Sequence, residues 1–122
     1  EARLFDPAYM SKEIVETLGF GSIGHADEIE TSHMAFRYPE LIDLEKARDH
    51  AHMPRPLYHI DPRDDRDTLC YVPATMADMK ATLGETGDTI AGRPSASSRE
   101  KGRAYHEHLV GRLVEVLEEL AR

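Results

Sequence analysis

The sequence contains a single cysteine, Cys70, so it cannot form a disulfide bond within the chain. It also lacks any apolar run that approaches the ~18 residues of a membrane span. Basic residues are few: 15 lysines and arginines stand against 23 aspartates and glutamates, for a formal net charge of −8. This balance repels polyanions and anionic lipid surfaces, so we expect no nucleic acid and no membrane among its partners. Nothing at the start resembles a secretory signal, and we therefore expect a cytoplasmic protein.

The amino-acid composition is that of an ordinary folded domain. Apolar residues make up 40% of the chain and charged residues 31%, as in soluble globular proteins. A chain of 122 residues is long enough for one domain and short for two. The first residue is Glu1 rather than Met, and the chain enters directly into a connecting segment. We therefore interpret residues 1–122 as part of a single domain that begins in a preceding segment.

Two helices are predicted in the first third of the chain. Asp6 before Pro7 is a typical helix start, and apolar residues recur at helical spacing up to Gly19, which predicts a helix over about 7–18. A second helix is predicted over about 26–37. Its first turns are acidic, as the positive end of a helix dipole favours, and a proline follows its end.

The third predicted helix covers about 98–121. The capping-box pattern Ser97-Ser98-Arg99-Glu100 opens it, and an apolar stripe follows one helical face to Leu120. His106 and His108 are two residues apart on this helix, so they cannot share a face, and we expect both to be solvated.

The middle of the chain, residues 52–90, has no helical period. Prolines and a charged run over 61–67 interrupt it, and Leu69 to Val72 is the only short strand predicted there. A long irregular segment inside a compact domain is uncommon unless it has a function. We therefore expect a lid or a subunit contact.

Gly19, Gly21 and Gly24 match the G-x-G-x-x-G fingerprint of dinucleotide-binding proteins. That fingerprint follows a strand, whereas a predicted helix precedes these glycines. We therefore interpret residues 19–24 as a hinge that exploits the backbone freedom of glycine.

The chemically richest segment follows this hinge and contains His25, Glu28 and Glu30. An imidazole can move protons near neutral pH, and carboxylates can ligate a divalent metal or orient the imidazole. Glu28 and Glu30 point to different sides of a helix, so we expect them to have different roles. In the structural alternative the acids only complement the helix dipole, and His25 is a capping or hinge residue. The residue pattern leaves both interpretations open.

Two segments resemble the creatininase family. Residues 24–32, Gly-His-Ala-Asp-Glu-Ile-Glu-Thr-Ser, are followed by Pro-Glu-Leu-Ile-Asp at 39–43 and Lys-Ala at 46–47. This order resembles the family pattern G-H-A-G-E-x-E-T-S, R-P-E-L-V-D, K-A. Farther on, residues 92–102 contain Gly-Arg-Pro-Ser-Ala-Ser and Glu-Lys-Gly, similar to the family's closing G-D-P-S-x-A-S-x-E-K-G. Both motifs occur in the family's order and spacing.

The resemblance implies a three-layer α/β/α domain, of which this chain would be the C-terminal, mostly helical part. It implies a metal-dependent hydrolase with two divalent metal ions (zinc, manganese or iron), ligated mostly by residues outside this chain. Metal-activated water would attack a carbonyl-containing bond in a small polar substrate such as a cyclic amide, formamide or cyclic ketone. The N-terminal half of the same domain would be its partner, within a homo-oligomer.

The resemblance also implies roles for three residues. His25 matches the family's proton-transferring histidine, Glu30 would be a metal ligand or a carboxylate that hydrogen-bonds to one, and Glu28 would orient His25 or contact substrate.

Three departures from the family pattern argue against creatinine as the substrate. Asp27 replaces a glycine, Gly24 stands where creatinine-hydrolysing members have a glutamate, and Gly21 stands where they have a tryptophan. The competing interpretation is a non-catalytic interaction or assembly subunit that partners an N-terminal half.

Overall fold

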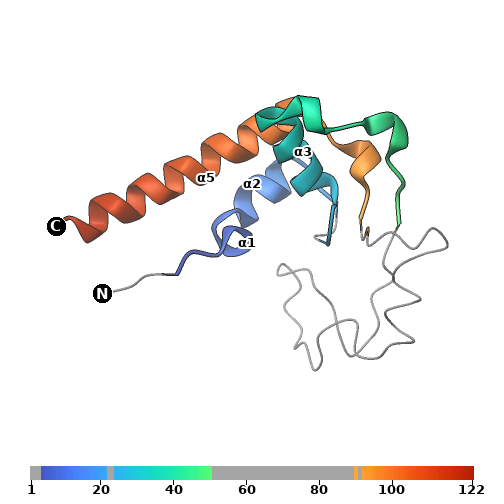
Figure 1. Ribbon diagram of the computed structural model, residues 1–122. Coiled ribbons are helices and arrows are strands. Elements are labelled where there is room, and N and C mark those ends of the chain that lie inside the picture. Colours follow the sequence, from blue (N-terminus) through green and yellow to red (C-terminus); the bar gives the residue numbers. More distant parts are fainter. Residues whose placement is uncertain (1–3, 22–23, 51–89, 91) are drawn as a thin grey trace, which may run out of the picture.

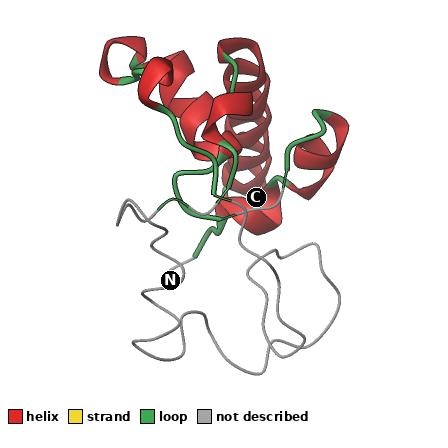
Figure 2. Cartoon of the chain, turned by 90° about the vertical axis from the view of Figure 1, so that its right-hand side faces the viewer, coloured by secondary structure: helices red, strands yellow, loops and turns green. Residues whose placement is uncertain are grey.

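The computed structural model describes residues 4–21, 24–50, 90 and 92–122, and its regular elements are helices. In chain order these are α1 (Pro7–Met10), α2 (Lys12–Thr17), α3 (Glu28–Arg37), the 3-10 helices η1 (Pro39–Leu41), η2 (Leu44–Lys46) and η3 (Pro94–Ala96), and α5 (Arg99–Leu120). Helices α1, α2 and α3 lie along the N-terminal part of α5, whose C-terminal end extends away from them (Figure 1). Figure 2 shows the same helices in a view turned by 90°.

The ranges given above contain no strand, and His50 and Gly92 form only an isolated antiparallel bridge. The sheet of a three-layer domain therefore stays a prediction, and the strand and lid predicted within 52–90 lie outside the described residues. No described helix combines the length and the apolarity needed to cross a membrane.

The helix predicted over 7–18 is two short helices, because Ser11 interrupts it. The backbone of Ser11 has φ −117° and ψ 7°, and its side chain is buried. Ser11 lies beside Tyr105 of α5 and lowers the pKa of its hydroxyl, although burial raises that pKa more.

The predicted helix end at Gly19 is confirmed. Gly19 has φ +62°, a conformation that glycine adopts without strain. The N–H of Gly19 donates to the carbonyl of Glu16, and that of Phe20 donates to the carbonyl of Val15. This pair of bonds is a Schellman motif, and it brings Phe20 back into the core beside Val15.

A small core forms where α2, the hinge, α3 and α5 meet. Phe20 and Tyr105 pack edge to face, with ring centroids 6.1 Å apart. The buried members of the core are Val15, Phe20, Ile29 and Tyr105, with Ile14, Leu18 and Leu109 packed against them.

The second and third predicted helices are confirmed with small changes at their starts. Helix α3 begins at Glu28 rather than near residue 26, because Asp27 is its N-cap. Helix α5 begins after Ser98, whose hydroxyl accepts the N–H of Lys101 at 3.1 Å. With Ser98 as N-cap, Glu100 is one position too early to complete the predicted capping box.

The expectation that His106 and His108 are solvated is wrong. Both are partly buried: His106 hydrogen-bonds to His33 of α3, and His108 to the carbonyl of Met10. The two histidines lie on different faces of α5, and each face packs against a different helix, α3 for His106 and α1 for His108.

The backbones of α3 and α5 come into contact at Ser32 and Gly102. A Cβ atom on Gly102 would lie 1.8 Å from the carbonyl oxygen of Ser32, which is far inside van der Waals contact. The same helices are joined by the N–H of Ser98, which donates to the Ser32 hydroxyl at 3.1 Å. Glycine at position 102 is therefore a condition of this packing.

We expect Gly102→Ala to destabilise the protein by about 1–3 kcal/mol, because the two helices must separate to admit the methyl group. Gly111→Ala is the matched control on the same helix. A Cβ at Gly111 meets nothing within 4 Å, so alanine should raise stability by about 0.5–1 kcal/mol through helix propensity. Urea unfolding of the full-length protein measures both. Equal stability of Gly102→Ala and the parent would contradict the close contact.

Candidate functional site

The candidate site is the turn that leads from the glycine hinge into α3. Asp27 is its buried centre, at 1% exposure. Its Oδ1 accepts the N–H of Glu30 at 2.8 Å, and its Oδ2 accepts the N–H of Gly24 at 2.8 Å. Both carboxylate oxygens are thus used to close the turn, and Asp27 is a structural residue.

Ala26 stands between His25 and Asp27 in a left-handed conformation with φ 48°. Such a conformation costs a non-glycine residue on the order of 1–3 kcal/mol. The Oε2 atom of Glu30 accepts the N–H of Ala26 at 2.6 Å and helps to hold it. The chain therefore bends sharply just after His25, whose side chain is exposed.

The two glutamates of α3 lie in different environments. Glu30 is exposed, whereas Glu28 is 5% exposed. Glu28 Oε2 accepts the N–H of Gly21 at 3.1 Å, and Oε1 pairs with Lys101 Nζ at 2.5 Å. Lys101 also lies over the Phe20 ring, 5.1 Å from its centroid. Glu28 thus connects the hinge, α3 and α5.

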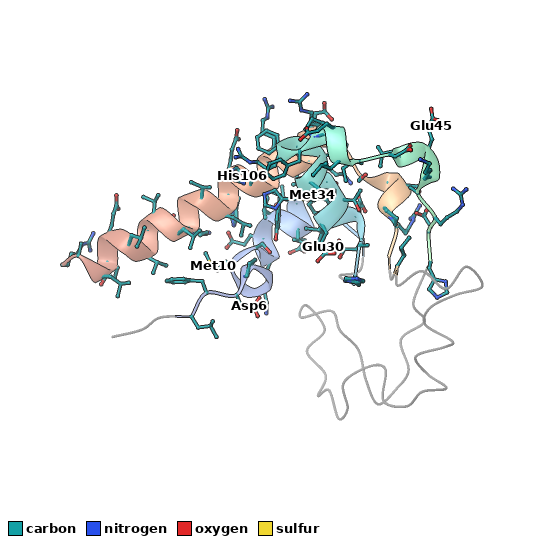
Figure 3. The ribbon with its side chains drawn as sticks, in the orientation of Figure 1. Asp6, Met10, Glu30, Met34, Glu45 and His106 are labelled. Atoms are coloured by element: carbon teal, nitrogen blue, oxygen red, sulfur yellow. The ribbon has the colours of Figure 1, made fainter. Side chains whose placement is uncertain are left out.

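The structure gives no described hydrogen bond between Glu28 and His25, so the expected orienting role of Glu28 stays a prediction. Figure 3 shows Glu30 near the start of α3 and His106 on α5.

The second motif, residues 92–102, packs against this turn. A Cβ on Gly92 would lie 2.6 Å from the Cβ of Asp27, so only glycine fits there. The Ser98–Ser32 hydrogen bond joins residues 66 positions apart. The two sequence motifs therefore meet in space around the N-terminal half of α3.

Asp49 and His50 hold the second motif in place, a role that the sequence did not suggest. The N–H of His50 donates to the carbonyl of Gly92 at 3.0 Å, and the reverse bond is 2.8 Å. The carboxylate of Asp49 accepts the N–H of Ser95 at 3.0 Å and its hydroxyl at 2.5 Å. These two bonds lower the pKa of Asp49. No local pattern marks Asp49, because its partners lie 46 positions away.

The turn presents an imidazole from His25 and a carboxylate from Glu30 to solvent. Only Oε2 of Glu30 makes a described hydrogen bond, so this side chain could give one oxygen ligand to a metal. No group of three or more histidine, cysteine or acidic side chains within the described ranges could hold a metal ion. The turn can therefore contribute to a metal centre, but other ligands would have to complete it.

The Glu28–Lys101 contact yields a prediction about the stability of this turn. Lys101→Met removes the cation and leaves the buried carboxylate of Glu28 without its charged partner. We expect a loss of about 1.5–3 kcal/mol, as for other hydrogen bonds to charged groups. The double variant Glu28→Gln/Lys101→Met should lose less than the sum of the two single changes.

Arg112→Met is the matched control, because Arg112 pairs with Glu13 and Glu115 at the surface and such pairs contribute little. Urea unfolding of all four variants measures the effects. Additive losses, or a Lys101→Met variant as stable as the Arg112→Met control, would show that Glu28 does not depend on Lys101.

Comparison with known proteins places these motifs in a family. Residues 5–117 match the creatininase family, described as creatinine amidohydrolase. A creatinine amidohydrolase from Pseudomonas putida is 33% identical over 85 residues, which cover 70% of this chain and 32% of that protein. The chain thus spans about a third of the length of this curated relative. No solved structure matches it.

The family match includes the turn at His25, the second motif and most of α5. It confirms the resemblance seen in the sequence and implies the family's fold. Because the match covers nearly the whole chain, this protein belongs to the creatininase family.

Proposed function

We propose that this chain is the C-terminal part of a metal-dependent hydrolase of the creatininase family that hydrolyses a carbonyl-containing bond in a small polar substrate. One observation carries the proposal. The two family motifs, far apart in sequence, pack together at Asp27 and Ser32 and leave His25 and Glu30 exposed on one turn. Family membership supports the hydrolase class.

In this proposal His25 gives a proton to the departing atom of the substrate. Imidazole can take and release a proton near neutral pH, and the exposed side chain can reach a substrate. Glu30 would contribute a carboxylate ligand. Two divalent metal ions, once bound, would polarise the substrate carbonyl and activate water. Asp27 and Glu28 would keep the turn rigid while His25 and Glu30 act.

The proposed substrate class rests on membership of the creatininase family, and the turn adds two restrictions. Asp27 is buried with both oxygens engaged, so it cannot contact substrate. Gly21 donates its N–H to Glu28 and brings no side chain to the hinge. We propose a cyclic amide other than creatinine, a formamide or a cyclic ketone as substrate; the relative from Pseudomonas putida is named for creatinine.

The outer half of α5 supports the proposal that another part of the domain covers it. Five of its apolar residues are 37–61% exposed: Val110, Leu113, Val114, Leu117 and Leu120. An apolar stripe of this kind normally packs on a neighbouring element. We propose that the N-terminal half of the domain covers this stripe and supplies the other metal ligands, within a cytoplasmic homo-oligomer.

The test of the proposed chemistry is His25→Asn in the full-length protein. General acid or base assistance is typically worth ~10² to 10⁴ in rate, so turnover should fall by that factor. Metal content and unfolding temperature should stay at the parent values. His50→Asn is the matched control, because the bridge at His50 uses only its backbone. Steady-state kinetics on cyclic amides, formamides and cyclic ketones, with metal analysis, measures these effects.

Near-parental turnover of His25→Asn with metals bound would show that His25 transfers no proton and is only a capping or hinge residue. A full-length protein that binds metal and hydrolyses none of these substrates would instead favour the non-catalytic assembly role.

Glu30→Gln tests the metal ligand separately. The amide oxygen of glutamine can still accept the N–H of Ala26, which now bonds Glu30 Oε2, so the turn should persist. An amide oxygen is a much poorer ligand for a dication than a carboxylate. We therefore expect lower metal occupancy with an unchanged unfolding temperature of the metal-free protein. Metal analysis after dialysis measures the occupancy. Full occupancy in Glu30→Gln would show that Glu30 is not a metal ligand.

A further inference from the structure

A pair of histidines joins α3 to α5 on the side away from the candidate turn. His33 Nε2 and His106 Nδ1 are 2.9 Å apart, and both side chains are partly buried. Aromatic rings enclose the pair. The Tyr105 ring packs edge to face on His33 with centroids 5.3 Å apart, and the Phe36 ring lies 5.5 Å from His106. The two imidazoles are therefore held in contact by their surroundings.

The hydrogen bond between two imidazoles depends on the number of protons that they carry. A neutral ring has one N–H donor and one bare nitrogen acceptor. With both rings neutral, or with one protonated, one nitrogen can donate to the other. With both protonated, two N–H groups and two positive charges face each other at 2.9 Å. The contact is therefore incompatible with the doubly protonated state.

Charged groups of both signs lie near the pair. On α3, Arg37 acts on His33, and its guanidinium lies 6.0 Å from the Phe36 ring centroid. On α5, Arg99, Glu100 and Arg103 line, together with Phe36, a surface cavity of about 380 Å³. The carboxylates of Asp27 and Glu30 act on Tyr105, which packs on His33. Burial lowers the pKa of His33, and His106 and Arg37 lower it further.

We propose that His33 and His106 form a proton-sensitive latch, which holds α3 against α5 near neutral pH and weakens as the pH falls. Helix α3 carries the turn with His25 and Glu30 at its start, so the latch would couple acidity to the order of the candidate site. The latch does not require the proposed hydrolase activity.

The direction of the pH effect follows from the His33 shift. A histidine whose pKa is lower in the folded protein binds fewer protons there than in the unfolded chain. The contribution of neutral His33 to the free energy of unfolding is complete above the ordinary histidine pKa of ~6.5. It is lost as the pH falls below that value.

The experiment uses a double variant that keeps the hydrogen bond and removes the protonation. Glutamine places an amide where imidazole has Nε2, and asparagine places one where it has Nδ1, so His33→Gln/His106→Asn preserves the contact. His108→Gln is the matched control on the same helix. His108 Nε2 contacts the Met10 carbonyl at 3.2 Å and can donate an N–H there whether or not the ring is protonated.

Unfolding temperature is measured for the full-length parent and both variants between about pH 7.5 and about pH 5.5, around the ordinary imidazole pKa. Acidification should lower the unfolding temperature of the parent and of His108→Gln by roughly 2–4 °C more than that of the double variant. A side-chain NMR titration of the parent should show that the pKa of His33 lies below the ordinary range of histidine. Equal acid losses in the parent and the double variant, or an ordinary pKa for His33, would overturn the latch.

Discussion

The contact between the Ser32 carbonyl and Gly102 sets the distance between α3 and α5, and the other α3–α5 contacts depend on it. At this separation Lys101 reaches Glu28, the N–H of Ser98 reaches the Ser32 hydroxyl, and His33 reaches His106. Each of these bonds is short-ranged and would be lost if the helices moved apart by the width of a methyl group. A single glycine in α5 therefore determines whether the charged, hydroxyl and imidazole pairs can exist.

The features predictable from the sequence are those that depend on residues within one helical turn. Gly19 ends a helix through its own backbone freedom, and the segments near Asp27 and Ser98 begin helices through bonds to residues three positions on. The break at Ser11 and the burial of His106 and His108 were missed because their partners are distant. His106 meets a residue 73 positions away, and His108 meets one 98 positions away. Local periodicity carries no information about such partners.

The candidate site shows the same division. The predicted placement of Glu28 and Glu30 on different sides of a helix agrees with their different burial, since spacing on a helix fixes that difference, whereas their different roles stay a prediction. It took Asp27 as a departure that bears on substrate choice, whereas the structure makes it the N-cap of α3. An aspartate supplies the capping oxygen that a glycine at this position lacks. Its burial against Gly92 could not be foreseen, because it depends on the meeting of two distant motifs.

The paired contacts of Asp49 and His50 with Ser95 and Gly92 bring the two ends of the intervening segment side by side. A segment whose ends are fixed next to each other can change length without altering the geometry at its base. The entropy of bringing two chain ends together grows only with the logarithm of the length between them, so doubling that length costs roughly 0.6 kcal/mol. Residues inserted or deleted between positions 50 and 92 would therefore leave the paired contacts at 49–50 and 92–95, and with them the turn at His25, in place.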